Sequence, residues 1–375
     1  MKILVASDKF KGSLTAAEAC AAIAAGLREG SPNESHEIRC LPIADGGDGI
    51  ADTLTRAAGG EWITATVHGP LGDTLTAGYG LIDEGKTAVI EMAAASGLAL
   101  LGDGPLDPLR ASTYGTGELI RDAVSRGVTE VLLGIGGSAT NDGGTGMALA
   151  LGFRFLDESG NELTALPDGM EQVARLVPPD SFPFPKVTVA CDVTNPLLGP
   201  RGCTAIYGPQ KGIAPETFFL HETRLARLVA ATGEVGKTAA ITPGAGAAGG
   251  LGFGAMVFLG ATLVPGFDLV ADRLGLGEAV KWADLVITGE GRLDHQSLEG
   301  KGPCGVADLA RAEGKGTAAF CGSLADRALE SAFGPIMEIG DPHLSLSENM
   351  SRGAERLRAA ARTFSSTLYP PRSHA

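Results

Sequence analysis

The chain has 375 residues, of which 44% are hydrophobic and 20% are charged, so it is long enough for two domains that each bury a core. It carries 44 acidic against 30 basic side chains, a formal net charge of −14, and its lysines and arginines form no cluster. This charge distribution excludes nucleic acid and anionic membrane surfaces as partners.

The chain contains neither a membrane-spanning run nor paired cysteines. Eighteen uncharged apolar residues never occur in succession, and the six cysteines are isolated from one another. We therefore expect a cytoplasmic protein with reduced, buried thiols.

Two strands, each followed by a polar loop and a helix, open the chain. Thr15 and Glu18 form a capping box that starts the first helix, and Lys11 lies just before it. A lysine there is either a solvated surface charge or a contact to a phosphate or carboxylate. After the second strand, Asp45 and Asp48 suit a cation or a substrate hydroxyl, or else an Asx turn and a helix cap.

Antiparallel strands joined by a hairpin turn are predicted between about residues 62 and 92, and we place a domain boundary near residue 70. Further on, the buried strand 131–135 runs into Gly136 and Gly137 and then into another helix, as in a parallel sheet. Backbone N–H groups at a helix start attract anions, so we expect a phosphate there. A plain tight turn is the alternative.

Two later segments place ionisable groups at predicted turns. Asp192 ends the strand 186–191, where ligands gather in open α/β sheets, and is a metal or base candidate. Lys211 lies in a glycine-proline loop that either presents it to a ligand or leaves it as a surface charge. The apolar, glycine-rich stretch 243–263 predicts a buried helix packed backbone to backbone.

The last third of the chain predicts a βαβ unit between residues 284 and 321. Its first strand precedes a long polar loop that carries Glu290, Arg292 and Asp294. Because loops this rich in ionisable groups are commonly functional, we count these side chains among the candidates.

Sequence motifs separate three classes of function. P-loop, nucleophile-elbow and zinc-protease motifs are absent, whereas glycine turns, isolated basic residues and carboxylates at strand ends match the needs of phosphoryl transfer. The turn 134–139 also resembles a dinucleotide fingerprint, and Asp157 could meet a ribose. An NAD-dependent oxidoreductase acting on a small hydroxy acid is therefore the main alternative, and a non-catalytic sugar-acid binding protein is the third.

Seven segments, in order along nearly the whole chain, resemble the bacterial glycerate kinase family of the glycerate 2-kinase type. They are residues 8–14, 44–49, 134–144, 192–197, 208–212, 243–252 and 287–294. Two positions depart from the family pattern. Lys9 stands where the family usually has Ser, and Asp48 where it usually has Glu.

The resemblance implies a kinase that phosphorylates D-glycerate in organic acid metabolism, giving 2-phosphoglycerate, with ATP and Mg²⁺ as cofactors. In-line transfer is expected in a cleft between two α/β domains. One is implied to be flavodoxin-like, with a parallel sheet built from residues 1–70 and 276–375. Residues 71–275 would form an inserted α/β domain with a mixed sheet. The resemblance leaves a monomer and a homodimer open.

On the basis of this resemblance, we assign roles to the site residues as hypotheses. The residues predicted to contact ATP are Gly136, Gly137, Ser138, Asn141, Asp142, Lys211 and Gly246. The residues predicted to contact glycerate are Lys11, Ser13, Asp48 and Arg292. Asp192 and Glu290 are predicted to hold Mg²⁺. Asp294 or Asp45 is predicted to accept the proton, with Asp192 and Lys11 also counted as catalytic.

Overall fold

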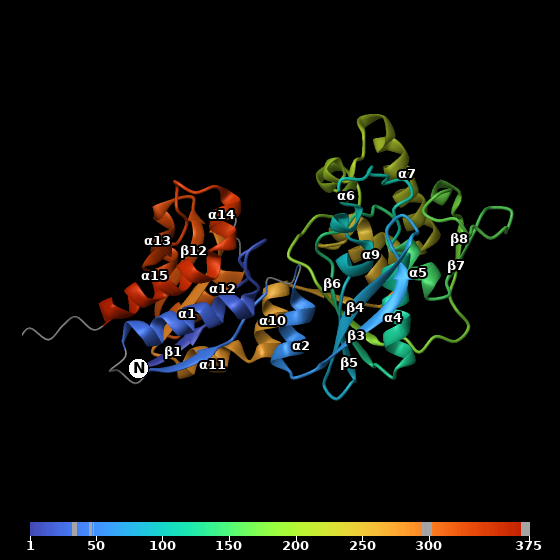
Figure 1. Ribbon diagram of the computed structural model, residues 1–375. Helices are drawn as coiled ribbons and strands as arrows, with labels where there is room; N and C mark the ends of the chain where they lie inside the picture. The colour runs from blue at the N-terminus through green and yellow to red at the C-terminus, as the bar shows by residue number, and fades with distance from the viewer. Residues whose placement is uncertain (32–35, 45–46, 48, 295–296, 298–301, 369–375) are drawn as a thin grey trace, which may run out of the picture. The chain divides into compact units, whose positions relative to one another are not determined.

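The computed structural model describes residues 1–31, 36–44, 47, 49–294, 297 and 302–368. The chain divides into two compact units (Figure 1). Unit 1 comprises residues 1–45 and 267–375, and unit 2 comprises residues 46–266. The first unit is therefore assembled from both ends of the chain.

Unit 1 contains a five-stranded parallel sheet in the order β13-β12-β11-β1-β2. The strands are β1 (Lys2–Val5), β2 (Glu37–Cys40), β11 (Leu285–Leu293), β12 (Gly316–Leu324) and β13 (Ile336–Glu338). Counted within the unit and read from β2, this order is 2-1-3-4-5, the flavodoxin-like arrangement. The predicted flavodoxin-like sheet built from both chain ends is confirmed.

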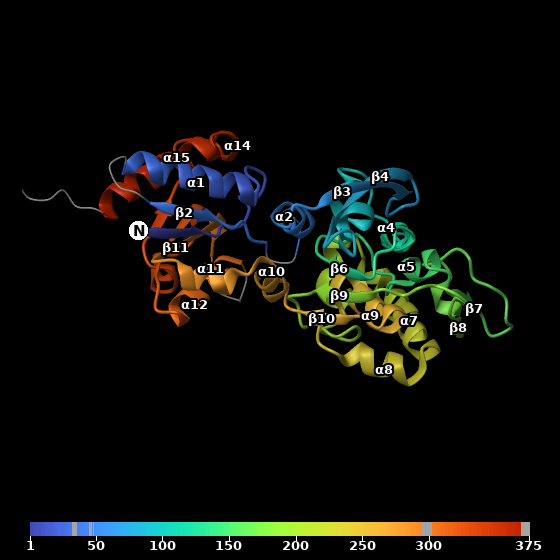
Figure 2. The same cartoon turned by 90° about the horizontal axis from the view of Figure 1, so that it is seen from below.

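Helices cover both faces of this sheet (Figure 2). One face carries α1 (Ala16–Gly30) and α15 (Gly353–Leu368), and the other carries α10 (Gly266–Leu274), α11 (Leu276–Trp282) and α12 (Gly302–Ala312). The short helices of this unit are α13 (Glu330–Phe333), α14 (Leu346–Ser351) and the 3-10 turn Arg327–Leu329. Because side chains alternate along a strand, Ile3 and Val5 join the α1 and α15 core, whereas Leu4 joins the core beneath α11 and α12.

Unit 2 contains a six-stranded mixed sheet in the order β10-β9-β6-β5-β4-β3. The strands are β3 (Glu61–His68), β4 (Thr74–Ile82), β5 (Thr87–Glu91), β6 (Glu130–Gly134), β9 (Lys186–Ala190) and β10 (Thr262–Val264). The β3-β4 and β4-β5 pairs are antiparallel and the other pairs are parallel, which confirms the predicted mixed sheet. A separate antiparallel pair is formed by β7 (Arg154–Leu156) and β8 (Arg175–Val177).

The helices of unit 2 pack on both faces of its sheet. They are α2 (Ile50–Ala57), α3 (Ala93–Ser96), α4 (Tyr114–Ser125), α5 (Thr145–Ala150), α6 (Cys203–Tyr207), α7 (Pro215–Ala231), α8 (Gly233–Ile241) and α9 (Ala247–Leu259), with 3-10 turns at Leu98–Leu101, Met170–Gln172 and Pro209–Lys211. Neighbouring residues of β4 show the two faces. The Tyr79 hydroxyl donates to Asp122 of α4 at 2.7 Å, whereas Gly80 leaves room for Thr55 of α2.

Both unit boundaries lie earlier in the chain than predicted. The sequence interpretation assigned the helix α2 to the first domain, because it follows a strand of that domain. In the structure the carboxylate of Glu91, at the end of β5, accepts hydrogen bonds from the N–H groups of Gly49 and Ala51 at 2.9 Å each, which ties α2 to unit 2. At the other boundary, the buried side chain of Phe267 already packs in the core of unit 1.

Within the described part of the chain, no helix combines the length and apolar character that a membrane span requires. All six cysteines are free thiols. Four of them are buried as expected, but Cys191 is half-buried and Cys40 is exposed.

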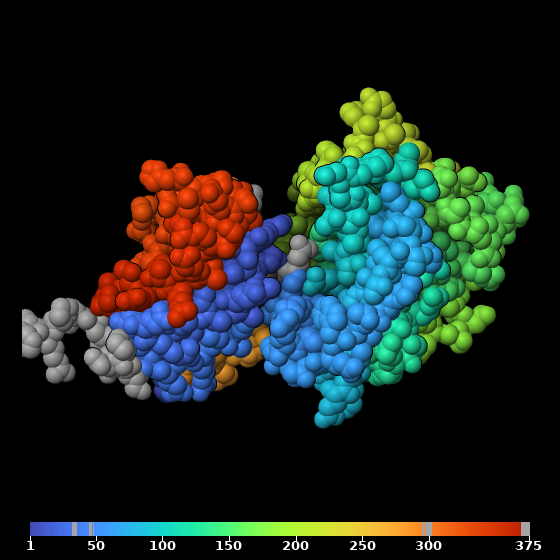
Figure 3. Space-filling model, viewed as in Figure 1, coloured from blue at the N-terminus to red at the C-terminus, as the bar shows by residue number. Residues whose placement is uncertain are grey.

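The closest helix contact in unit 1 joins the two ends of the chain. Helices α1 and α15 lie side by side, and their segments form one continuous surface in the space-filling view (Figure 3). A Cβ atom added at Gly26 would overlap the carbonyl oxygen of Arg358, and one at Gly30 would overlap that of Arg362. These two glycines therefore let the helix backbones touch.

We expect Gly26→Ala to lower the melting temperature. Alanine favours an isolated helix by about 1 kcal/mol, but the overlap with the α15 backbone costs more, about 1–3 kcal/mol. The matched control is Gly277→Ala in α11, where an added Cβ meets no atom within 4 Å, so its melting temperature should not fall. Calorimetry of both variants checks this, and a melting temperature raised by both changes would contradict the close helix contact.

Candidate functional site

Three of the predicted segments meet in unit 2 at the edge formed by the carboxyl ends of its parallel strands. The N–H of Gly143 donates to the carbonyl of Gly249 at 3.0 Å, which joins the turn after β6 to the turn inside α9. The N–H of Gly246 donates to the carbonyl of Asn195 at 2.9 Å, which joins the same region to the loop after β9. Ligands of open α/β sheets bind at this edge, so the structure places these segments where a site is expected.

The carboxylate of Asp142 is the buried centre of the turn after β6. It accepts hydrogen bonds from the N–H and hydroxyl of Thr113 at 2.9 and 2.8 Å and from the N–H groups of Gly144 and Gly146 at 3.0 and 3.1 Å. The Thr113 hydroxyl accepts in turn from the N–H of Met147 at 2.9 Å. Burial raises the pKa of Asp142, while the hydrogen bonds from Thr113 and the two glycines act to lower it.

This arrangement differs from the predicted helix start. The sequence interpretation placed the helix directly after Ser138–Asp142, with its free N–H groups open to a phosphate. Helix α5 begins only at Thr145, and two of the N–H groups around its start already donate to Asp142. The accessible part of the turn is instead at the half-buried Gly136 and the exposed Gly137, the second of which has φ of +71°.

Lys211 lies beneath this turn, and its side chain is 2% exposed. Its ammonium group donates to the Ser138 hydroxyl and to the carbonyl of Thr140, both at 2.6 Å. Burial lowers the pKa of Lys211 to about 8, while Cys203 and Asp142 act weakly in the opposite direction. Among the residues that the structure describes, none forms an ion pair with this group, so a buried cation here lacks a partner of opposite charge.

A second buried polar group flanks the turn. The side-chain amide of Asn141 donates to the hydroxyl of Thr204 and to Nδ1 of His221, both at 3.3 Å. Burial, aided by Arg224, lowers the pKa of His221 to about 4 and keeps it neutral near pH 7. Asn141 is thus held from α6 and α7.

The dinucleotide alternative loses its structural basis here. A dinucleotide fold needs a helix start free to receive the pyrophosphate, and Asp142 occupies that position. Asp157, the proposed ribose partner, follows β7, which forms a separate two-stranded sheet with β8 and is not part of the six-stranded sheet. Its carboxylate accepts from the N–H and amide of Asn161 at 2.8 and 2.9 Å.

In unit 1 the corresponding edge lies at the ends of β1 and β11, where the strand order reverses. The hydroxyl of Ser7 donates to the carbonyl of Gly289 at 3.0 Å, and the N–H of Asp8 donates to the same carbonyl at 2.9 Å. The carboxylate of Asp8, which is 6% exposed, accepts from the N–H of Lys9 at 2.6 Å. Such a switch point is the usual ligand crevice of flavodoxin-like sheets.

The predicted substrate residues Lys11 and Arg292 lie on adjacent segments of this edge. A Cβ added at Gly291 would lie 3.2 Å from the backbone nitrogen of Lys11, so the loop after β1 rests against the end of β11. Both basic side chains are exposed, and Arg292 pairs with the carboxylate of Asp294 at 3.3 Å. Strand β11 itself runs on to Leu293, so Glu290 and Arg292 belong to a strand and not to the predicted loop.

The two predicted metal ligands belong to different units. Asp192 directly follows β9 in unit 2, is exposed, and accepts from the N–H of Gly266 at 2.8 Å. Glu290 lies in β11 of unit 1 and is half-buried. Across the described ranges, no group of three His, Cys, Asp or Glu side chains is close enough to hold a metal. Carboxylate oxygens are among the ligands that Mg²⁺ takes, and phosphate and water commonly complete its shell.

The remaining predicted residues are placed as follows. Gly246 is buried, and a Cβ there would overlap the carbonyl oxygen of Pro196, so it contributes close packing. The Ser13 hydroxyl donates to the carbonyl of Met350 at 2.5 Å. Asp45 and Asp48 lie outside the described residues.

The sequence interpretation did not select four residues that the structure places in these two regions: Asp8, Thr113, Thr204 and His221. Asp8 carried a usable signal, because a carboxylate directly after a buried strand lies at the ligand edge of a parallel sheet. The other three contact the turn after β6 from segments distant in sequence. The spacing of these three residues along the chain does not predict those contacts.

Comparisons with known proteins all point to the same family. A model of the glycerate kinase family matches residues 3–369. A glycerate kinase of Halalkalibacterium halodurans is 45% identical over 373 residues, covering 96% of this chain and 97% of that protein. The glycerate 2-kinase of Escherichia coli is 40% identical over 383 residues, covering 98% of both. A crystal structure from Salmonella typhimurium that carries the name glycerate kinase 2 superposes with a TM-score of 0.88 and 40% identity, across 98% of each chain.

We expect Asp142→Ala to destabilise unit 2 by about 3 kcal/mol or more, because it leaves the buried N–H groups of Thr113, Gly144 and Gly146 without this acceptor. In a Trp282→Phe background only Trp62 of unit 2 is fluorescent, so urea unfolding then reports this unit. The control Asp157→Ala removes a carboxylate outside the buried turn and should cost about 1 kcal/mol or less. If the two variants are equally stable, Asp142 does not hold the turn together.

Proposed function

The chain belongs to the glycerate kinase family, and we propose that it transfers the γ-phosphoryl group of ATP to a hydroxyl of D-glycerate. The product is 2-phosphoglycerate, as the name of the Escherichia coli relative suggests. The reaction belongs to organic acid metabolism and takes place in the cytoplasm. Neither the comparisons nor the turn after β6 supports the oxidoreductase alternative.

The observation that carries the proposal is the buried ammonium group of Lys211. A cation taken out of water without an ion-pair partner is unfavourable unless an anion restores the balance. Polyphosphate oxygens supply that charge, and the half-buried Gly136 and the exposed Gly137 let such a group approach the backbone closely. We place the ATP phosphates against this turn, over Ser138 and Lys211.

The other residues around the turn shape this nucleotide site. Asp142 acts through the backbone that it holds, because its carboxylate is buried and hydrogen-bonded within the chain. Asn141 is oriented by Thr204 and His221, and Gly246 allows the turn before α9 to pack closely. These residues keep the site in shape before the nucleotide arrives, which lowers the cost of ordering it.

We assign glycerate to unit 1. Lys11 and Arg292 lie on touching segments and both present exposed cations, which suit a carboxylate. Asp294, paired with Arg292, is placed to accept the proton of the attacking hydroxyl. Asp45 is kept as the alternative base and Asp48 as a substrate contact.

Asp192 and Glu290 are the carboxylates that we assign to Mg²⁺. The exposed position of Asp192 after a strand suits a cation bound to phosphate oxygens. When bound, Mg²⁺ neutralises part of the charge on the transferring group.

A coupled assay of ADP release tests the function directly. The purified protein should release ADP only when ATP, Mg²⁺ and glycerate are all present, and lactate or glycolate should give much slower release. An NADH titration should give no fluorescence enhancement. ADP release that is independent of glycerate, or the absence of release with every hydroxy acid, would overturn the proposal.

We expect Lys211→Met to reduce kcat/KM for ATP by about 10- to 100-fold, the value of one charged hydrogen bond. In the wild-type protein the pKa of Lys211 is lowered to about 8, so the ammonium is charged below that pH and neutral above it. The wild-type kcat/KM for ATP should therefore fall as the pH rises through about 8, whereas that of Lys211→Met should stay flat.

The control for this prediction is Lys237→Met. Lys237 is an exposed lysine of α8 that pairs with Glu234 at 2.7 Å, and its loss should leave the pH profile unchanged. A wild-type profile that is flat between pH 7 and 9, together with full activity of Lys211→Met, would remove Lys211 from nucleotide binding.

A further inference from the structure

We propose that Asn349 is a positioning residue for glycerate binding, because it anchors the helix α14 on which the loop Phe10–Leu14 rests. This inference depends on the proposed function, in which Lys11 of that loop holds the glycerate carboxylate. Asn349 does not itself contact the substrate in this proposal. It acts through α14, Met350 and the loop.

The loop Phe10–Leu14 is a compact turn whose position depends on a few contacts. Phe10 and Leu14 exchange backbone hydrogen bonds at 2.9 Å, and the N–H of Ser13 donates to the carbonyl of Phe10 at 2.8 Å. Phe10 is buried in the core, whereas Lys11 is exposed. The turn therefore moves as one rigid segment, so a displacement of the turn also displaces the charge of Lys11.

The outer side of this loop rests on Met350, in the last turn of α14. The Ser13 hydroxyl donates to the carbonyl of Met350 at 2.5 Å, and a Cβ at Gly12 would overlap the methyl group of Met350. At the start of α15, a Cβ at Gly353 would overlap the Ser13 hydroxyl oxygen. Beside these contacts lies an open pocket of 640 Å³, which is lined by residues of both the loop and α14.

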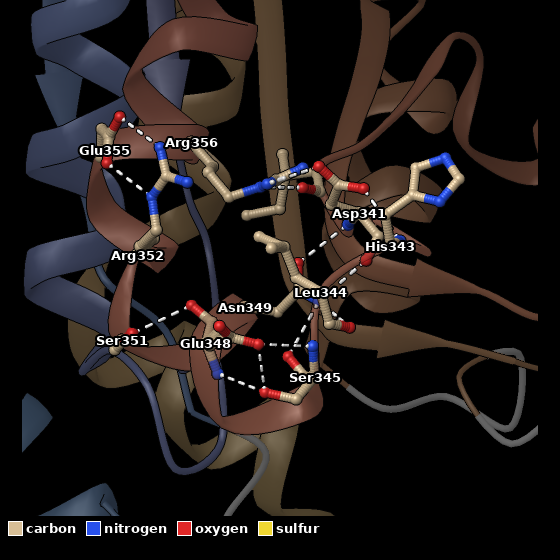
Figure 4. Close-up of polar contacts among 11 residues, drawn as sticks. Asp341, His343, Leu344, Ser345, Glu348, Asn349, Ser351, Arg352, Glu355 and Arg356 are labelled. Carbon is tan, nitrogen blue, oxygen red and sulfur yellow. Dashed lines mark hydrogen bonds and ion pairs between the residues drawn. The ribbon is translucent and has the colours of Figure 1, made fainter.

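Helix α14 has only six residues, too few to be stable by itself, so its own position must come from its surroundings. A capping box orders its first turn. The N–H of Glu348 donates to the Ser345 hydroxyl at 3.3 Å, and the Glu348 carboxylate accepts from the N–H of Ser345 at 2.9 Å (Figure 4). This closes the turn but ties it to no other element.

Asn349 makes the connection to the rest of unit 1 (Figure 4). Its side-chain oxygen accepts from the N–H of Asp341 at 2.8 Å, and its amide donates to the carbonyls of Asp341, Leu344 and Ser345 at 3.0, 3.2 and 3.2 Å. One half-buried side chain thus binds the whole loop between β13 and α14.

That loop is in turn fixed to the sheet, because the N–H of Ile339 donates to the carbonyl of Cys321 in β12 at 2.8 Å, and it is also fixed to α15. Arg356 of α15 donates to the carbonyl of Ile339 at 2.5 Å and to the carboxylate of Asp341 at 3.3 Å. The N–H of His343, followed by Arg356, lowers the pKa of Asp341 and keeps it charged for this contact. The path from the sheet to Lys11 therefore runs through Asp341, Asn349 and Met350 to the Ser13 hydroxyl.

We expect Asn349→Ala to raise KM for glycerate about tenfold and to leave KM for ATP within about twofold of wild type, since displacements near 1 Å cost up to about 100-fold. Asn349→Asp keeps the acceptor for the N–H of Asp341 and loses the amide donors, so its KM for glycerate should be intermediate. This variant also serves if Asn349→Ala does not fold.

The matched control is Arg352→Ala, which removes an exposed ion pair to Glu355 at the junction of α14 and α15 (Figure 4). Both KM values should match those of the wild type, because solvent screens an exposed ion pair and it contributes little to the structure. A KM for glycerate that is unchanged in Asn349→Ala, or that rises equally in Arg352→Ala, or that rises together with KM for ATP, would overturn the inference.

Hydrogen exchange separates this inference from the proposed function. In Asn349→Ala the amides of Ser13 and Leu14 should exchange about tenfold faster than in the wild type, whatever the substrate is. Equal exchange rates would refute the anchoring role. If the exchange rates rise while the wild-type protein does not phosphorylate glycerate, the anchoring stands and only the assigned substrate fails.

Discussion

A single buried carboxylate holds together the turn after β6 in unit 2. Asp142 joins the first residues of α4 to those of α5, and so fixes the path of the chain from the end of β6 to Gly146. The backbone of that path supplies the Thr140 carbonyl, and its side chains supply the Ser138 hydroxyl, the two acceptors of Lys211. A rigid turn above a buried cation is the arrangement that electrostatic stabilisation of phosphate requires.

The fold could be read from the sequence where local patterns and chain direction agreed. The late βαβ unit predicted a parallel pair of strands, and β11 and β12 do pair in parallel. The family resemblance implied that the N-terminal strand joins the same sheet, and β1 pairs with β11 in parallel. The prediction failed at α2 and at the end of β11. Glu91 fixes α2 from a strand that comes later in the chain, and Glu290 and Arg292 continue a strand although their polarity is typical of a loop. Both outcomes depend on tertiary contacts that no local pattern encodes.

For the candidate site, the sequence indicated which segments matter but not what each side chain does. The turn after β6 was selected from its glycines and the turn of α9 from the family resemblance, and the structure joins them through Gly143 and Gly249. Lys211 was equally compatible with a surface charge, because burial of a lysine depends on the elements folded around it. His221 gave no signal at all, since its contact with Asn141 spans 80 residues.

The assembly of unit 1 from both chain ends has a consequence during protein synthesis. Unit 2 has all its strands once residue 266 has left the ribosome. By contrast, β1 then has only β2 beside it, and the face of α1 that meets α15 is still bare. The strand β1 is therefore synthesised long before the helix α15 that completes its side of the unit. A truncated chain would therefore carry a finished inserted unit and an open N-terminal sheet edge, a target for chaperones and proteases.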